Sequence, residues 1–189
     1  MSSNIIKNST PHNITAHAED SGVAVGYAGS FAPTFNIFLS NGKRTTPAQG
    51  YFNLIIGYSP EEKDYIIIAR QRALTEYISE DARSEFSSLD AEAVEKIKKM
   101  PAIISSERED NDGQQATFGF INDIRIQDNG IKIYFQRCFP IPFSFLVENQ
   151  SALAMHGFEL TRTHWTIKKV DLFEVMQEAG VFPGGFNAE

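Results

Sequence analysis

The sequence predicts an α+β fold in which strands dominate: a strongly bent antiparallel sheet or a small β-barrel, with two mid-chain helices and a short C-terminal helix. Three observations predict this fold class. Runs of β-branched and aromatic residues recur along the chain, and an Asn-Gly pair separates two of them. Apolar residues at steps of three and four occur only in two middle segments and near the C-terminus.

The composition is that of a folded protein. The 189-residue chain has 42% apolar residues, a net charge of −7 and fifteen phenylalanines, which excludes an intrinsically disordered chain. No run approaches the roughly 20 apolar residues of a membrane-spanning helix, and the first residues lack the pattern of a secretory signal. Cys138 is the only cysteine, so an intrachain disulfide is excluded. We therefore expect a cytoplasmic protein with no membrane partner.

The N-terminal region differs from the rest of the chain. Residues 1–21 show no apolar periodicity and are expected to form a loose arm, followed by a single α+β domain over residues 22–189. Alternation predicts short strands at residues 23–28 and 35–39. The small residues of the first strand would allow it to pair along an exposed edge, which favours self-association.

The next segment predicts two strands and two helices. Residues 51–56 and 65–69 are β-branched or aromatic runs that we expect to pair as a hairpin. Ser59-Pro60 between them has a second interpretation, the start of a helix. Apolar residues at helical spacing then predict helices over residues 73–86 and about 90–99.

The Asn129-Gly130 pair predicts a tight type I′ hairpin, because both residues accept positive φ. With these two residues as the loop, Ile126 pairs with Ile133 and Ile124 with Phe135, so one face is apolar. The opposite, wet face then carries Arg125, Gln127, Lys132 and Tyr134. Residues 101–106 are expected to add a third strand.

The C-terminal part predicts a strand and a short helix. Residues 158–168 have strand character, although a bulge near Thr161 is needed to reconcile the parity of the apolar positions. Asp171 is suited to cap the helix and Gly180 to end it.

The strand at residues 162–168 contains the best candidate site. Arg162, His164 and Lys168 share one face of a strand, and Trp165, the only tryptophan, lies on the other. We take Arg162, His164, Trp165 and Lys168 as candidate ligand-binding residues for a phosphate, a nucleotide or an acidic partner. The alternative is structural: Trp165 fills the core and the polar face is simply exposed to water.

Other chemistry finds little support. The four histidines lack metal-ligand spacing, and the chain has no phosphate-binding loop or nucleophile elbow, so we expect no metal and no cofactor. A catalytic pair of Cys138 and His164 is disfavoured. Cys138 adjoins the apolar stretch 139–143, which predicts an inert, buried thiol.

The stretch Thr163-His164-Trp165-Thr166-Ile167-Lys168, followed by Asp171-Leu172, resembles the ending of uncharacterised small bacterial proteins. These proteins share the pattern Thr-His-Trp-x-Ile/Val-Lys-x-x-Asp-Leu. The resemblance covers the last third of the chain and implies a bacterial or mobile-element protein. It carries no activity over to this chain.

These observations favour a non-enzymatic binding or accessory protein that contacts another protein, or a small anionic ligand, through a sheet surface. The first alternative is an enzyme with a dispersed site, in which His164 acts as general acid or base beside Arg162 and Lys168. The second is a nucleic-acid-binding domain that uses the same positive stripe. The acidic net charge disfavours nucleic acid as the partner.

Overall fold

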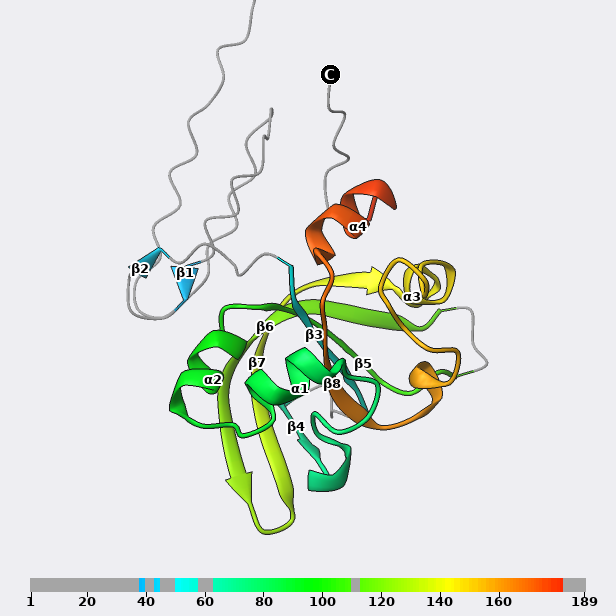
Figure 1. Cartoon of the computed structure of the whole chain (residues 1–189). Coiled ribbons are helices and arrows are strands. Elements are labelled where there is room, and N and C mark those ends of the chain that lie inside the picture. Colours follow the sequence, from blue (N-terminus) through cyan, green and yellow to red (C-terminus); the bar gives the residue numbers. More distant parts are fainter. Residues whose placement is uncertain (1–37, 40–42, 45–49, 58–62, 110–112, 182–189) are drawn as a thin grey trace, which may run out of the picture. The chain divides into compact units, whose positions relative to one another are not determined.

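The computed structural model describes residues 38–39, 43–44, 50–57, 63–109 and 113–181 (Figure 1). The chain divides into two compact units, residues 1–45 and 46–189. In the first unit, β1 (Phe38–Leu39) pairs antiparallel with β2 (Lys43–Arg44). The expected arm over residues 1–21, the expected strand over 23–28 and the Ser59-Pro60 segment lie outside the described residues.

The second unit is built on a six-stranded sheet in the order β4-β7-β6-β5-β3-β8. Its strands are β3 (Phe52–Ile56), β4 (Tyr65–Ile68), β5 (Pro101–Ser105), β6 (Gln115–Gln127), β7 (Gly130–Pro142) and β8 (His164–Lys168). Neighbouring strands are antiparallel, except that β3 and β5 are parallel. The α+β prediction is confirmed. The sheet is open, with β4 and β8 at its edges, so the described strands do not close into a barrel.

The predicted hairpin of residues 51–56 and 65–69 is wrong. Both segments are strands, but β3 lies between β5 and β8, whereas β4 pairs with β7 at the other edge of the sheet. The predicted strand at residues 101–106 is confirmed as β5, which pairs with β6.

Within the described residues, four helices and two 3₁₀ turns accompany the sheet. They are α1 (Glu80–Phe86), α2 (Ala91–Ile97), α3 (Phe143–Glu148), α4 (Leu172–Glu178), η1 (Arg70–Arg72) and η2 (Glu159–Thr161). The sequence patterns predict α1, α2 and α4 but not α3. Asp171 caps α4, as expected, by accepting the Phe173 and Glu174 N–H groups. Among the described residues, no helix has the length and apolar content needed to cross a bilayer.

Helix α1 begins seven residues later than the predicted start at Ala73, after the N-cap Ser79. Leu74 and Tyr77 have φ values of 56° and 57°, which a right-handed helix does not allow. Likewise, the predicted strand over residues 158–168 is shortened to β8, because its first part forms η2. A 3₁₀ turn therefore replaces the expected bulge near Thr161.

The main core lies between α1, α2 and one face of the sheet. These two helices lie beside each other in front of the strands in Figure 1. Phe86 and Ile97 from the helices pack in one cluster with Ile55, Ile133 and Trp165 from the strands. On the second face, Phe173 of α4 packs edge-on against Phe118. Both faces of the central strands are therefore buried.

The β6–β7 hairpin has a different register from the predicted one. Gln127 pairs with Gly130, so the loop is Asp128–Asn129, and neither loop residue has a positive φ. Gly130 begins β7 with φ +149°, and a Cβ there would lie 2.6 Å from the carbonyl oxygen of Ile68. The glycine is thus needed for the close approach of β4, not for a type I′ turn. Because the register shift is two residues, the apolar and polar faces stay as predicted.

Candidate functional site

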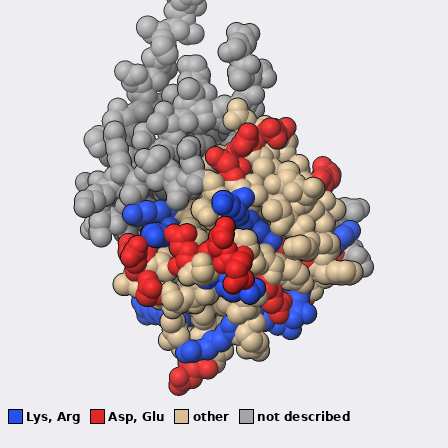
Figure 2. All heavy atoms as spheres, viewed as in Figure 1, with Lys and Arg blue, Asp and Glu red and all other residues tan. Residues whose placement is uncertain are grey.

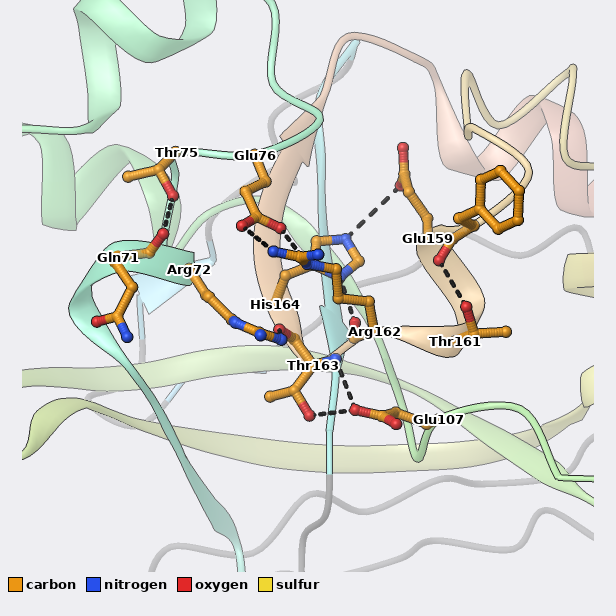
Figure 3. Close-up of polar contacts among 11 residues, drawn as sticks. Gln71, Arg72, Thr75, Glu76, Glu107, Glu159, Thr161, Arg162, Thr163 and His164 are labelled. Atoms are coloured by element: carbon orange, nitrogen blue, oxygen red, sulfur yellow. Dashed lines mark hydrogen bonds and ion pairs between the residues drawn. The ribbon is translucent and has the colours of Figure 1, made fainter.

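Three of the four residues singled out by the sequence lie on one strand. His164, Trp165 and Lys168 belong to β8, at the edge of the sheet beside β3. His164 and Trp165 have no solvent exposure, and Lys168 is 4% exposed. Arg162 is exposed and lies two residues before the strand (Figure 3). The four residues therefore do not form a continuous positive stripe on the surface.

A loop that precedes α1 covers the edge strand β8. Leu74 N donates to the carbonyl oxygen of Trp165 at 2.8 Å. Farther along this loop, the carbonyl oxygen of Tyr77 accepts from Thr166 Oγ1 at 3.1 Å and from Lys168 Nζ at 2.9 Å. The expectation of a water-exposed polar face on β8 is wrong, because Thr166 and Lys168 turn their polar atoms to this loop instead of to solvent.

Glu159 of η2 balances the buried charge of Lys168. Its Oε1 lies 2.6 Å from Lys168 Nζ and accepts the backbone N–H of His156 at 3.0 Å. Burial raises the pKa of the Glu159 carboxyl, but the neighbouring His164 and Lys168 outweigh this, so its pKa lies below the ordinary value of 4.5. Burial lowers the pKa of Lys168, and Glu159 offsets this only in part. An ionised carboxylate is the state that these contacts favour.

Arg162 is paired with a carboxylate as well. Its Nε lies 2.6 Å from Oε2 of Glu76, and its Nη2 lies 2.7 Å from Oε1, so the pair is bidentate (Figure 3). Each of the two cations expected to attract an anion thus already faces an acidic side chain.

The residue between Arg162 and β8 joins two further segments. The backbone N–H and the hydroxyl of Thr163 both donate to Glu107 Oε1. Arg72 of η1 donates to the carbonyl oxygen of Thr163 at 3.3 Å. In Figure 3, these contacts and the Arg162–Glu76 pair surround the start of β8. The contacts hold the strand in place from two connections, the one between β4 and α1 and the one between β5 and β6.

A second polar surface lies on the second face of the sheet, near the tip of the hairpin. We call it the basic–aromatic face. Two cross-strand rows form it: Tyr65 opposite Tyr134 opposite Asp123, and Ile67 opposite Lys132 opposite Arg125. Lys63, just before β4, approaches the Tyr65 ring. The six residues of the face that carry a charge or a tyrosine ring are Lys63, Tyr65, Asp123, Arg125, Lys132 and Tyr134.

The cations of this face lie against the aromatic rings. Lys132 Nζ is 3.8 Å from the centre of the Tyr65 ring and 4.8 Å from that of Tyr134. The Arg125 guanidinium is 4.8 Å from the Tyr134 ring and forms an ion pair with Asp123 at 2.8 Å. The Arg125 side chain is 62% exposed, and Tyr65, Lys132 and Tyr134 are half-buried, so solvent reaches this face most freely at Arg125.

The sequence predicted part of this face. Alternation in the hairpin placed Arg125, Lys132 and Tyr134 on a wet surface, and their positions in the structure agree. The sequence analysis missed Tyr65, because β4 and β7 are distant in the sequence and no local pattern indicates that they pair. The only sequence signal for this face was the presence of a basic residue and a tyrosine, Lys132 and Tyr134, at alternate positions of one strand.

Other chemistry is sparse in the described part of the chain. No group of three His, Cys, Asp or Glu side chains that could hold a metal ion occurs among the described residues. Cys138 is exposed as a residue, so the expectation that it is buried is wrong, although its thiol group is partly desolvated. It is the extra residue where β7 bulges, because Phe118 pairs with Phe139 and Gly119 with Arg137.

Figure 2 shows one side of the molecule, on which basic and acidic side chains are intermixed. No broad region of one sign covers that side. Comparisons of the chain with protein-family models, with curated proteins and with solved structures found no match.

Proposed function

We propose that this chain is a non-enzymatic binding module that contacts an acidic segment of another protein through the basic–aromatic face. One observation carries the proposal: the ammonium of Lys132 lies against two tyrosine rings, at 3.8 Å and 4.8 Å from their centres, on a solvent-accessible sheet surface. Tyrosine and arginine are the residues that most often dominate the binding energy of protein interfaces. Because the cations already lie against the tyrosine rings, their side chains lose less conformational entropy when a partner binds.

The charge of the face favours an acidic partner. Arg125 and Lys132 against the carboxylate of Asp123 leave one net positive charge among these three described residues, on a chain whose net charge is −7. A positively charged patch on a negatively charged protein selects negatively charged partners and raises the rate of encounter with them. The remainder of the surface would repel an acidic segment, so binding is directed to this face.

Nucleic acid fits this face less well. Single-stranded nucleic acid binds to a sheet mainly by stacking its bases on aromatic rings. Here, Lys132 and Arg125 already lie over the rings of Tyr65 and Tyr134. A carboxylate can approach the same cations from the side without displacing them. The enzyme alternative has less support because His164 and Lys168 are buried and lie beside Glu159.

A titration with a short polyglutamate peptide tests the proposal. Amide ¹H–¹⁵N spectra of the whole chain should show saturable shifts that map to β4, β6 and β7. The double variant Arg125→Glu/Lys132→Glu should weaken binding by at least about tenfold, since it removes two attractive charges and adds two repulsive ones.

The matched control is Lys98→Glu/Lys99→Glu at the end of α2, which changes the net charge by the same amount. It should keep most of the affinity. Equal loss in both double variants would mean that only the net charge matters, and the proposed face would then be wrong. Binding of an oligothymidylate with a steep salt dependence, and none of the peptide, would favour the nucleic-acid alternative instead.

A further inference from the structure

Two buried polar atoms on β8 and η2 face each other without a hydrogen-bond partner. They are Nε2 of His164 and Oε2 of Glu159, which lie 3.7 Å apart (Figure 3). Both side chains have no solvent exposure. Buried polar atoms are nearly always paired, because leaving one unpaired costs as much as losing a hydrogen bond. A proton between Nε2 and Oε2 would therefore give both atoms a hydrogen-bond partner.

The other ring nitrogen of His164 fixes where that proton belongs. Nδ1 lies 2.7 Å from the carbonyl oxygen of Arg162. A carbonyl oxygen only accepts, so Nδ1 must donate and carries a proton. If the ring is neutral, Nε2 then holds a lone pair that faces the carboxylate of Glu159. Two buried acceptors would repel each other, whereas a second proton on Nε2 satisfies both atoms at once.

We propose that His164 is protonated on both nitrogens and that Glu159 bridges it to Lys168, which makes the three side chains a pH-sensitive latch. Glu159 Oε1 holds Lys168, and Oε2 holds His164. The latch joins η2 to β8 and, through the Tyr77 carbonyl oxygen that accepts from Lys168, to the loop before α1. Loss of the His164 proton leaves two acceptors face to face and releases η2 from the strand.

Apart from Glu159 and Lys168, the side chains next to the His164 ring add little to the charge around it. The Tyr77 ring meets His164 edge-on at 5.1 Å and also lies 5.7 Å from the exposed ring of His156. The opposite residue on β3, Ile56, carries no charge.

Two further charged neighbours, Arg162 and Glu107, have partners outside the cluster. Arg162 pairs with Glu76, and Glu107 accepts from Thr163. Inside the cluster, one carboxylate therefore faces two cations, so the His164 proton decides whether Oε2 is bonded.

The state of the His164 ring can be read directly from long-range ¹H–¹⁵N spectra of the whole chain at neutral pH. The wild-type protein should show both ring nitrogens protonated, whereas Glu159→Gln should leave only Nδ1 protonated, because the glutamine amide can donate to Nε2. A singly protonated ring in the wild type overturns the proposal, and this measurement needs no variant to fold.

Amide hydrogen exchange tests the release of η2. After correction for the intrinsic pH dependence of exchange, the amides of residues 159–163 should exchange at least about tenfold faster once the His164 ring has lost its second proton. The control variant His156→Gln should behave like the wild type, because His156 lies at the surface and bonds to Glu159 only through its backbone. Exchange that does not change when the ring titrates contradicts the latch.

Discussion

The indole Nε1 of Trp165 donates a hydrogen bond to Oδ1 of Asn53 at 3.1 Å, and neither residue has any solvent exposure. The amide of Asn53 in turn donates to the carbonyl oxygen of Ile97 at 3.2 Å, near the end of α2. One buried asparagine thus joins two strands and a helix. It also pairs the indole N–H of Trp165 and gives a second donor to the Ile97 carbonyl oxygen, which already accepts from the Met100 N–H at 3.1 Å.

Replacement of Asn53 by leucine should therefore destabilise the protein strongly. The shape is nearly kept, but the buried indole N–H loses its partner, at about 1–3 kcal/mol, whereas the Ile97 carbonyl oxygen keeps its bond from the Met100 N–H. Urea denaturation followed by Trp165 fluorescence should show a loss of about 1–3 kcal/mol in the free energy of unfolding. Asn122→Leu, on the exposed bulge of β6, should change this free energy by no more than about 0.5 kcal/mol. Equal effects of the two variants would mean that the buried bonds contribute little.

Gly119 should tolerate no side chain. A Cβ at this position would lie 2.1 Å from the backbone carbonyl oxygen of Gln136, at the point where β7 bulges. Because backbone must move to make room, Gly119→Ala should cost about 1–3 kcal/mol and lower the thermal midpoint by several degrees. The matched control is Gly157→Ala, where nothing lies within 4 Å of the added atom. An unchanged midpoint in Gly119→Ala would show that the bulge can shift freely.

Local patterns predicted those parts of the fold that neighbouring residues determine. The β6–β7 hairpin and the Asp171 cap are examples, since the groups that form them are close in sequence. They could not predict that the Tyr77 carbonyl covers β8, because Tyr77 and Thr166 are 89 residues apart. The parallel pairing of β3 and β5 could not be predicted for the same reason, because the two strands are distant in the sequence.

For the candidate site, too, local patterns predicted the features set by neighbouring residues and missed the contacts with distant ones. Alternation correctly placed His164 and Lys168 on one face of a strand, but burial of that face depends on Glu159, which the sequence patterns assigned to the strand itself. A lysine on a buried strand requires an acidic partner. With 24 acidic residues in the chain, that rule alone could not select Glu159.

The Glu159–Lys168 pair should make stability depend on pH at the acid side. The folded protein holds the pKa of Glu159 below 4.5, so the pair stabilises the fold above that value. This contribution is lost as the pH falls through the lowered pKa. Glu159→Gln leaves Lys168 buried without its counter-ion and should cost about 3–5 kcal/mol at neutral pH.

Urea denaturation at neutral and acidic pH measures this dependence. The difference between wild type and Glu159→Gln should narrow as the pH falls, because protonation removes the wild-type charge as well. Glu178→Gln, an exposed position on α4, should follow the wild type throughout. A gap that stays constant with pH would mean that the carboxylate charge is not what stabilises η2 against β8.

Cys138 should react slowly despite its exposed position. Desolvation raises the pKa of its thiol from 9.0 to about 11, so the native protein holds about a hundredfold less thiolate near neutral pH than the unfolded chain does. Alkylation by iodoacetamide should be correspondingly slow in the native state and rise about tenfold per pH unit, without a plateau, up to about pH 10. The same reaction in urea provides the control, and there the rate should level off above about pH 9. A native rate that levels off at the same pH as the unfolded one would show that the bulge leaves the thiol fully solvated.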